Sequence, residues 1–186
     1  TKYRVIETVP EGYEAEQESQ EITIQAGTNT VTFQNRLVLG NLELSKVDES
    51  DPTVKLSGAE FTVTKPNGAK VPMKEVLDQT GKGTGVYRLE GLPYGRYTVQ
   101  ETKAPEGFVL DTGVYEVMID TDGKTCEVEN KAGVGFINEA MRGNLKIVKT
   151  SSDGKIKGFA FRITGANGYD IILETNDKGE IVIEGI

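Results

Sequence analysis

Three polar residues stand where the alternation of strand-like stretches calls for apolar side chains, and their types could carry chemistry. In a strand, successive side chains point to opposite faces. Lys46 is in phase with two leucines, Glu101 with a tyrosine and a valine, and Asn138 with a valine and a phenylalanine. Because burial of a lone charge is costly, an amine, a carboxyl group and a carboxamide at such positions need a common explanation.

The residues by themselves leave two interpretations open. One is a partly buried ion pair between Lys46 and Glu101, with Asn138 filling the remaining hydrogen bonds. Such a pair stabilises a fold poorly, because the cost of desolvation offsets the attraction between the charges. The other is a group of three side chains that react with one another.

The elements that must position these side chains are short strands. Stretches of β-branched or aromatic residues alternate with polar residues and are separated by turns rich in Gly, Pro and Asn. The pattern predicts an all-β chain, with a sandwich of seven or more short strands in each unit. We expect strands at residues 3–7, 22–24, 30–35, 40–48, 58–64, 86–89, 97–101, 114–119, 125–128 and 135–138. Residues 73–79 could form one helical turn or a loop.

The chain repeats itself with a unit of about 100 residues. Three pairs of segments match. FQN at 33–35 followed by GNL at 40–42 matches FIN at 136–138 followed by GNL at 143–145. GAEFTVT at 58–64 matches GFAFRIT at 158–164, and LEGL at 89–92 matches IEGI at 183–186. The last residue corresponds to Leu92 and the second to Arg96. We therefore expect residues 1–39 to be the C-terminal half of one repeat, 40–142 a complete repeat, and 143–186 the N-terminal half of a further repeat.

The two half-repeats carry incomplete versions of the same polar set. Glu7 and Asn35 lie in the first half without a lysine, and Lys149 lies in the last half without a glutamate or an acceptor. The turn after Glu7 is one residue shorter than the turn after Glu101. We expect the missing partners to come from residues outside this sequence. A further hypothesis is that neighbouring chains complement each other, so that Lys149 of one meets Asn35 and Glu7 of the next.

Composition removes several classes of function. Histidine is absent, which excludes Ser–His and Cys–His catalysis and histidine metal ligation, and we expect neither a cofactor nor a metal. The net charge of -8 and the lack of a basic stripe argue against nucleic-acid binding. No apolar run has the length of a membrane span.

Three local patterns have an ordinary structural explanation. The glycines of residues 81–85 have neither the P-loop nor the dinucleotide spacing, and they favour a flexible hairpin loop. Residues 120–123 begin like a calcium loop but lack the rest of its pattern, so we expect a hairpin turn on Asp122 and Gly123. Cys126 is the only cysteine, and we expect a half-buried strand thiol.

Three motifs resemble the B-type repeat of Gram-positive surface adhesins and pilins, the Cna B-type or SpaA-like domain. They are LELSKVD at 42–48, LPYGRYTVQETKAPEGF at 92–108 and FINE at 136–139. The resemblance covers essentially the whole chain. It implies tandem immunoglobulin-like sandwiches of the reverse-Ig or prealbumin-like type. It also implies an extracellular, cell wall-anchored location, with the anchor outside this sequence.

In many members of that family, a lysine on the first strand and an asparagine or aspartate on the last strand join in an isopeptide bond, assisted by a glutamate. The resemblance assigns these roles to Lys46, Asn138 and Glu101. Glu7 would assist in the same way in the first half-repeat, and the candidate bond residues are Asn35 in that half and Lys149 in the last half. An apolar core supports the assignment, because it lowers a lysine pKa and raises a glutamate pKa.

We therefore expect a structural stalk or shaft module of a Gram-positive adhesin or pilus, in which the isopeptide bond gives resistance to force and proteolysis. The bond forms once, so we expect no enzyme with turnover. The expected partners are neighbouring repeats of the same polypeptide, with host matrix and other pilin subunits as further candidates. The alternative is an adhesin module that recognises a host matrix protein or glycan through its loops, best through residues 73–85.

Overall fold

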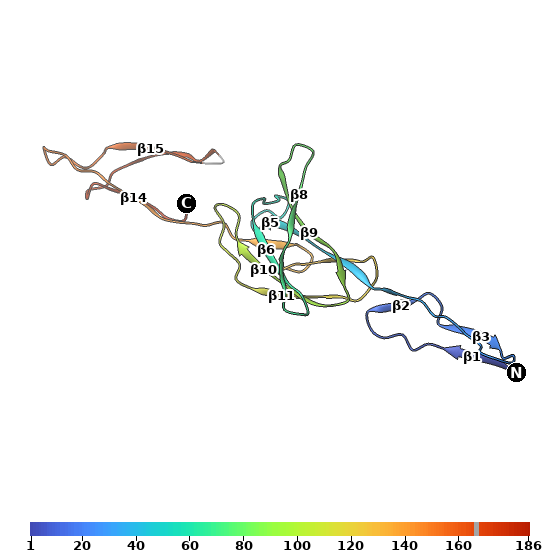
Figure 1. Cartoon of the computed structure of the whole chain (residues 1–186). Coiled ribbons are helices and arrows are strands. Elements are labelled where there is room, and N and C mark those ends of the chain that lie inside the picture. The colour runs from blue at the N-terminus through green and yellow to red at the C-terminus, as the bar shows by residue number, and fades with distance from the viewer. Residues whose placement is uncertain (166–167) are drawn as a thin grey trace. The chain divides into compact units, whose positions relative to one another are not determined.

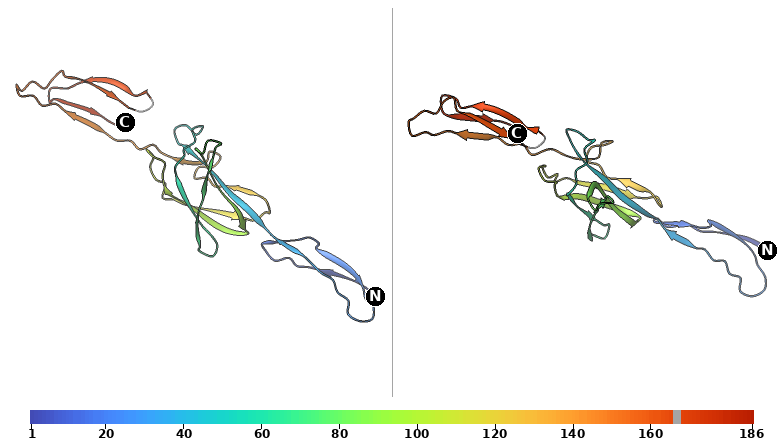
Figure 2. Two further views of the ribbon diagram at one scale, coloured as in Figure 1. Left: turned by 45° about the horizontal axis from the view of Figure 1, so that its top comes forward. Right: turned by 90° about the horizontal axis from the view of Figure 1, so that it is seen from above.

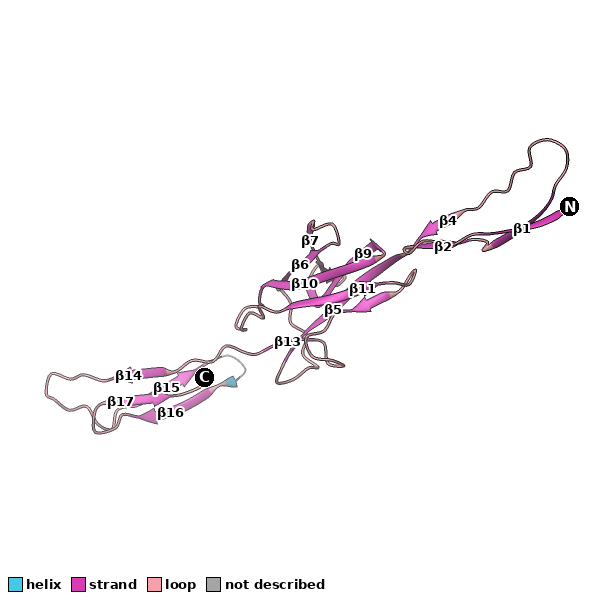
Figure 3. Cartoon of the chain, turned by 90° about the horizontal axis from the view of Figure 1, so that it is seen from below, coloured by secondary structure: helices cyan, strands magenta, loops and turns pink. Residues whose placement is uncertain are grey.

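The computed structural model describes residues 1–165 and 168–186, and the chain is all-β as predicted (Figure 3). Two compact units divide it, Thr1–Ala140 and Met141–Ile186, and each is described by itself. Within the described ranges, no helix has the length and apolar character that a membrane crossing requires.

A two-sheet sandwich forms the main part of the first unit (Figures 1 and 2). One sheet has the strand order β11-β10-β6-β7, and the other has the order β12-β5-β9-β8 with β13 also paired to β5. Their bounds are β5 Leu39–Asp48, β6 Glu60–Thr64, β7 Lys70–Pro72, β8 Lys74–Leu77, β9 Gly83–Pro93, β10 Gly95–Lys103, β11 Val114–Ile119, β12 Thr125–Glu127 and β13 Phe136–Asn138.

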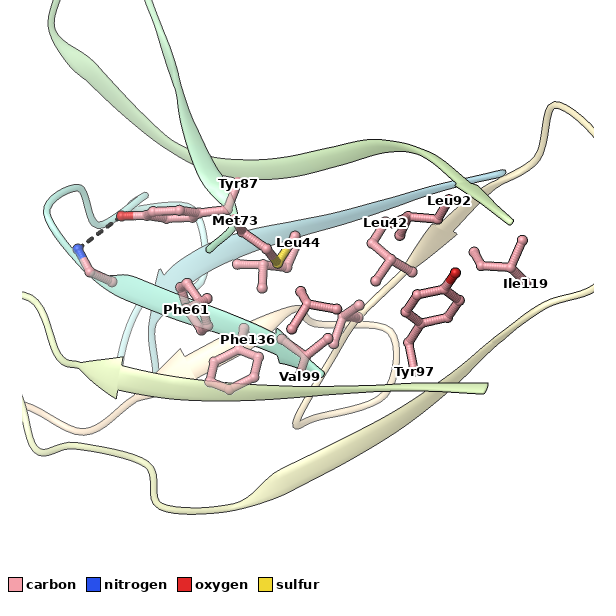
Figure 4. Packing of buried hydrophobic residues seen from close by; sticks show 13 residues of the cluster. Leu42, Leu44, Phe61, Met73, Tyr87, Leu92, Tyr97, Val99, Ile119 and Phe136 are labelled. Carbon is pink, nitrogen blue, oxygen red and sulfur yellow. Dashed lines mark hydrogen bonds between the residues drawn. The ribbon is translucent and has the colours of Figure 1, made fainter. Parts of the chain in front are cut away.

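The core lies between these two sheets, and both contribute alternate side chains to it (Figure 4). Its largest members are Phe61, Tyr87, Tyr97 and Phe136, each at most 2% exposed. Phe61 packs edge-on against both Tyr87 and Phe136, with ring centroids 5.0 Å apart in each pair. The Tyr87 hydroxyl accepts a hydrogen bond from the Ala59 amide at 2.9 Å. Burial of these rings supplies the apolar driving force that holds the sheets together.

Two strand registers determine the positions of Lys46 and Glu101 in the sandwich. The parallel pairing of β5 with β13 sets Lys46 opposite Phe136, and the antiparallel pairing of β10 with β6 sets Glu101 opposite Phe61. Gly135 permits the first pairing. Its φ is 128°, and a Cβ built on it would lie 2.9 Å from the Ser45 carbonyl oxygen. Glycine is therefore required where β13 approaches β5.

Residues 1–37 add two short antiparallel ladders to the first unit. The strands are β1 Lys2–Ile6 with β3 Ser19–Thr23, and β2 Tyr13–Ala15 with β4 Asn35–Leu37. Tyr3 faces Ile22 across the first ladder. The equivalent pair in the sandwich, Tyr97 and Val117, has the same relationship between β10 and β11. The first ladder thus repeats the local pairing of the sandwich strands that it resembles in sequence.

The second unit also consists of two ladders. β14 Leu145–Val148 pairs with β17 Glu180–Ile183, and β15 Ala160–Thr164 pairs with β16 Asp170–Glu174. Leu145 lies opposite Ile183, as Leu42 lies opposite Leu89 in the sandwich. The division into a half, a whole and a half repeat remains a prediction, and these matched registers support it.

Two of the predicted local elements are wrong. Residues 30–34 form no strand, and β4 begins only at Asn35. A strand needs a neighbour that satisfies its backbone groups, and no ladder partner in the described residues faces this stretch. Residues 74–77, expected to be a helical turn or a loop, form the strand β8, because Lys74 and Glu75 pair with β9.

The turn at residues 120–123 is also not a hairpin. It leads from β11 in one sheet to β12 in the other, and β12 pairs in parallel with β5. The Asp122 carboxylate holds this crossover in place by accepting the Leu39 amide at 3.0 Å. The hairpin predicted at residues 81–85 is confirmed, because β8 and β9 pair in antiparallel orientation around it.

Candidate functional site in the sandwich core

The three polar residues singled out by their phase all lie in the core. Lys46 projects from β5, Glu101 from β10 and Asn138 from the last position of β13. Their exposed fractions are 0%, 1% and 3%. The strand alternation therefore predicted their burial correctly, and the chain folds with an amine, a carboxyl group and a carboxamide enclosed together.

Glu101 lies between the other two side chains. The Asn138 Nδ2 group donates to both Glu101 oxygens, at 3.0 Å to Oε1 and 2.9 Å to Oε2. The Lys46 Nζ atom lies 4.0 Å from Glu101 Oε1 and donates to the Phe136 carbonyl at 3.0 Å. The Asp111 amide donates to Glu101 Oε2 at 2.9 Å. Three different strands thus deliver the cluster, and a loop amide fixes its central carboxyl group.

One polar atom of the cluster has no partner. The Asn138 Oδ1 atom is buried and accepts no hydrogen bond from any described residue. A buried carbonyl without a donor is costly. A half-turn of the carboxamide exchanges its oxygen and nitrogen positions. In the turned orientation, a protonated Glu101 would donate to Oδ1, and Nδ2 would take the position that the oxygen now holds.

Burial disfavours the charged form of both ionisable members. It lowers the pKa of Lys46 from 10.5 to about 8, although the nearby negative charge of Glu101 opposes this shift. Burial also raises the pKa of Glu101, against the hydrogen bonds from Asp111 and Asn138 and the charge of Lys46. The Phe136 ring, 5.4 Å from Nζ, forms part of the apolar wall that causes these shifts. Burial therefore favours the neutral amine and the neutral acid more than exposure to solvent would.

A family comparison agrees with this architecture. A model described as SpaA, a prealbumin-like fold domain, matches residues 40–132. The chain belongs to this family. The matched range contains Lys46 and Glu101 and ends before Asn138. The resemblance drawn from the sequence motifs is thereby confirmed, together with the fold class.

One solved structure extends the likeness beyond the matched range. The Bacillus anthracis TIE protein aligns with 100% of this chain at 28% identity and a TM-score of 0.76, and the chain spans 34% of that protein. The major pilin subunit BcpA of Bacillus cereus aligns with 58% of this chain at 27% identity and a TM-score of 0.43, and 31% of that subunit is covered. No curated protein matches the chain.

A second layer of residues supports the cluster of the SpaA domain and was missed from the sequence. Asn130 holds β13, since its side chain donates to the Ile137 carbonyl at 2.8 Å and accepts the Ile137 amide at 2.7 Å. Asn130 also donates to Asp111 Oδ2 at 2.7 Å, and so does the Tyr115 hydroxyl, at the same distance. Asp111 is thereby fixed with its amide directed at Glu101.

Only one feature of the sequence could have indicated this second layer. The Asp111 carboxylate accepts the amide of Gly113 at 2.7 Å, which is the local turn that an Asp-x-Gly pattern predicts. That pattern predicts a turn but says nothing about contact with β10 or β13. Asn130 lies in a loop with no periodicity, so its role depends on the tertiary fold alone.

The partial-repeat candidates lie in two separate places. Glu7 and Asn35 come together in the first unit, where Asn35 Nδ2 donates to Glu7 Oε1 at 2.5 Å. Glu7 Oε2 and Asn35 Oδ1 are buried and have no hydrogen-bond partner among the described residues. Lys149 belongs to the second unit, where its Nζ atom lies 4.5 Å from the centre of the Phe159 ring. A glutamate–asparagine contact like that of the core is therefore present in residues 1–37 as well.

In the part of the chain that the structure describes, no group of three or more histidine, cysteine, aspartate or glutamate side chains is arranged to hold a metal ion. Cys126 is half-buried on β12, as expected, with its sulfur 3.5 Å from the Met118 carbonyl oxygen. Among the described residues, neither a metal site nor the Cys126 thiol therefore adds a reactive group to the Lys46–Glu101–Asn138 cluster.

Proposed function

We propose that the SpaA domain is a structural stalk or shaft module of a Gram-positive surface adhesin or pilus, and that it crosslinks itself between Lys46 and Asn138. The observation that carries the proposal is the enclosed Lys46–Glu101–Asn138 cluster, in which the pKa of the amine is lowered to about 8. A well-packed apolar core has no need of this arrangement for stability, because buried ion pairs contribute little to it.

The chemistry follows from the contacts of the three side chains. The neutral Lys46 amine attacks Cγ of Asn138, and protonated Glu101 donates to the carboxamide oxygen as negative charge develops there. The Nζ–Cγ bond forms and the Cγ–Nδ2 bond breaks. Glu101 transfers a proton from Nζ to Nδ2, so that the nitrogen leaves as ammonia. The fold supplies the proximity, which removes most of the entropic barrier.

The strand pairing makes this bond mechanically useful. β5 and β13 are the first and last strands of the sandwich and lie side by side, so the bond ties the entry of the domain to its exit. By analogy with a disulfide that closes a loop of about 90 residues, the tie stabilises the fold by on the order of 4–5 kcal/mol. The reaction occurs once for each chain and is not turnover.

This function places the chain outside the cell, in a wall-anchored protein whose neighbouring repeats are its first partners. The TIE protein supports the fold on which this proposal rests, since its structure aligns with the whole chain at 28% identity. Other pilin subunits are the further partners that we propose.

The test is the intact mass of the denatured chain. We expect the wild type to be lighter by one ammonia than its sequence requires, and Lys46→Ala and Glu101→Ala to have their full masses. Lys103→Ala is the matched control, because Lys103 lies on the same strand as Glu101 but is exposed and paired with Glu60. A wild type at full mass would contradict the crosslink.

A further inference from the structure

The loop between β10 and β11, residues 104–113, contacts both the acid of the cluster and the end of β13. The Asp111 amide donates to Glu101 Oε2 at 2.9 Å. Two residues earlier in the same loop, the Val109 amide donates to the Glu139 carbonyl at 2.9 Å, one residue beyond β13. The loop therefore joins the strand that carries the acid to the strand that carries the acceptor.

The Asp111 carboxylate makes a second connection between these elements. Its Oδ2 atom accepts hydrogen bonds from the Asn130 carboxamide and the Tyr115 hydroxyl, both at 2.7 Å. Asn130 also bonds the amide and the carbonyl of Ile137 on β13. The Tyr115 ring packs edge-on against Phe136 at the start of β13, with the ring centroids 5.2 Å apart. The position of Asp111 and the docking of β13 therefore depend on each other.

The Asp111 carboxylate also acts on the cluster through its charge. Burial lowers the pKa of Lys46, and the negative charges of Glu101, Asp111 and Asp48 oppose this shift. Burial raises the pKa of Glu101, and the charge of Asp111 acts in the same direction. The titratable side chain in direct contact with Asp111 is Tyr115, and burial together with this carboxylate raises its pKa to about 12. The charge of Asp111 thus favours the protonated forms of both the amine and the acid.

We propose that Asp111 is a positioning residue of the crosslinking reaction, which couples the docking of β13 to the placement of the Glu101 acid and sets the pH range of the reaction. This inference rests on the function proposed for the Lys46–Glu101–Asn138 cluster. The reactive state needs a neutral amine and a protonated acid. Because the charge of Asp111 keeps protons on both groups, its removal moves both pH limits of the reactive state downward.

The test starts from a full-length chain that has not yet reacted. Cys126 is the only cysteine, so residues 1–125 as a thioester and residues 126–186 can be joined in denaturant by native chemical ligation, which leaves the sequence unchanged. Lys46 and Asn138 lie in different fragments, so neither fragment can form the bond before ligation. Dilution of the denaturant starts folding, which tyrosine fluorescence follows. Intact mass then gives the rate of ammonia loss from the folded chain at each pH.

Two substitutions separate the charge of Asp111 from its hydrogen bonds. Asp111→Asn removes the charge and keeps the backbone amide that donates to Glu101. We expect its profile of rate against pH to move to lower pH by about 1 unit relative to the wild type. Tyr115→Phe keeps the charge and the aromatic ring, and removes one hydrogen bond to Asp111. We expect it to lower the rate by about two- to tenfold without moving the profile.

Asp120→Asn is the matched control. Asp120 follows β11, is exposed, and lies 3.8 Å from Lys124 Nζ, so the substitution removes the same charge from the surface. We expect the rate and the profile of the wild type. A profile of Asp111→Asn that coincides with the wild type, or an equal shift in Asp120→Asn, would overturn the electrostatic role. A wild-type rate in Tyr115→Phe would overturn the positioning role.

A titration that needs no reaction separates this inference from the function proposed for the core. In Asn138→Ala the Lys46 amine stays free, and the carbon-13 resonance of its Cε atom reports its pKa. We expect Asp111→Asn in this background to lower that pKa by about 1 unit. If the wild type loses no ammonia, the proposed crosslink fails and this titration still decides. A lowered pKa would support the action of Asp111 on the amine, and an unchanged pKa would overturn it.

Discussion

Lys46 lies directly opposite Phe136 in a parallel ladder, and its side-chain amine donates back to the carbonyl of that same residue at 3.0 Å. This hydrogen bond holds the Lys46 amine beside Phe136, which lies two residues before Asn138 on β13. In this parallel register, β13 begins beside the lysine, and Asn138 lies two residues further along the strand. The positions of the amine and the carboxamide therefore follow from one strand pairing, and β10 of the other sheet adds Glu101.

Glu101→Gln tests the acid without removing its hydrogen-bonding shape. We expect the variant to fold and to keep the contact with Asn138, but to retain its full mass because glutamine cannot transfer the proton. Urea unfolding should show a loss of about 4–5 kcal/mol relative to the crosslinked wild type. Glu60→Gln, an exposed carboxylate on β6, is the control and should still lose ammonia. Loss of ammonia from Glu101→Gln would contradict the role of the acid.

The lowered pKa of Lys46 predicts a pH dependence in a chain that cannot crosslink. Asn138→Ala keeps the Lys46 amine free, and Asn138 is not among the groups that shift its pKa, so we expect burial still to lower that pKa from 10.5 to about 8 in the folded state. Between these values the unfolded state binds more protons, so stability should rise with pH by roughly 3 kcal/mol across the window. The wild type, whose amine is consumed, should lack this rise.

The control for this experiment is a second substitution at the lysine. Lys46→Met in the Asn138→Ala background removes the titrating amine and keeps an apolar side chain of similar length. Its urea midpoint should not rise between pH 8 and 10.5. An equal rise in both variants would assign the effect to other groups and contradict the lowered pKa.

Asn130→Ala tests the second layer. The substitution removes two hydrogen bonds to Ile137 and one to Asp111, all at 2.8 Å or less. We expect a loss of about 1–3 kcal/mol in unfolding free energy and slower release of ammonia during refolding, followed by mass spectrometry. Asn67→Ala, in the exposed turn between β6 and β7, loses only the hydrogen bond from the Ala69 amide and should leave the release of ammonia unchanged. Unaltered kinetics in Asn130→Ala would remove its positioning role.

Gly135→Ala tests the approach of β13 to β5. The added Cβ would lie 2.9 Å from the Ser45 carbonyl oxygen, and the φ of 128° is unfavourable for alanine. We expect the crosslink to form more slowly and the fold to lose about 1–3 kcal/mol. Gly143→Ala, which has open space and no positive φ, is the control. A crosslink that forms at the wild-type rate would show that β13 can dock without this close approach.

The sequence predicted the cluster because strand alternation is a local property. A period of two is enough to show that Lys46, Glu101 and Asn138 point inward, and the repeat indicates which strands correspond. Asp111 and Asn130 could not be found in this way, because their roles depend on loops whose paths are set by tertiary contacts. Residues 30–34 have the strand pattern but no neighbour, so the pattern predicted a strand that does not form.

The adjacency of β5 and β13 also determines the topology of the crosslinked polypeptide after it is denatured. A bond between Lys46 and Asn138 turns the unfolded chain into a closed ring with one tail at each end. A ring has a smaller hydrodynamic radius than the linear chain of equal mass. The crosslinked protein should therefore migrate ahead of Lys46→Ala in a denaturing gel, although the two differ little in mass.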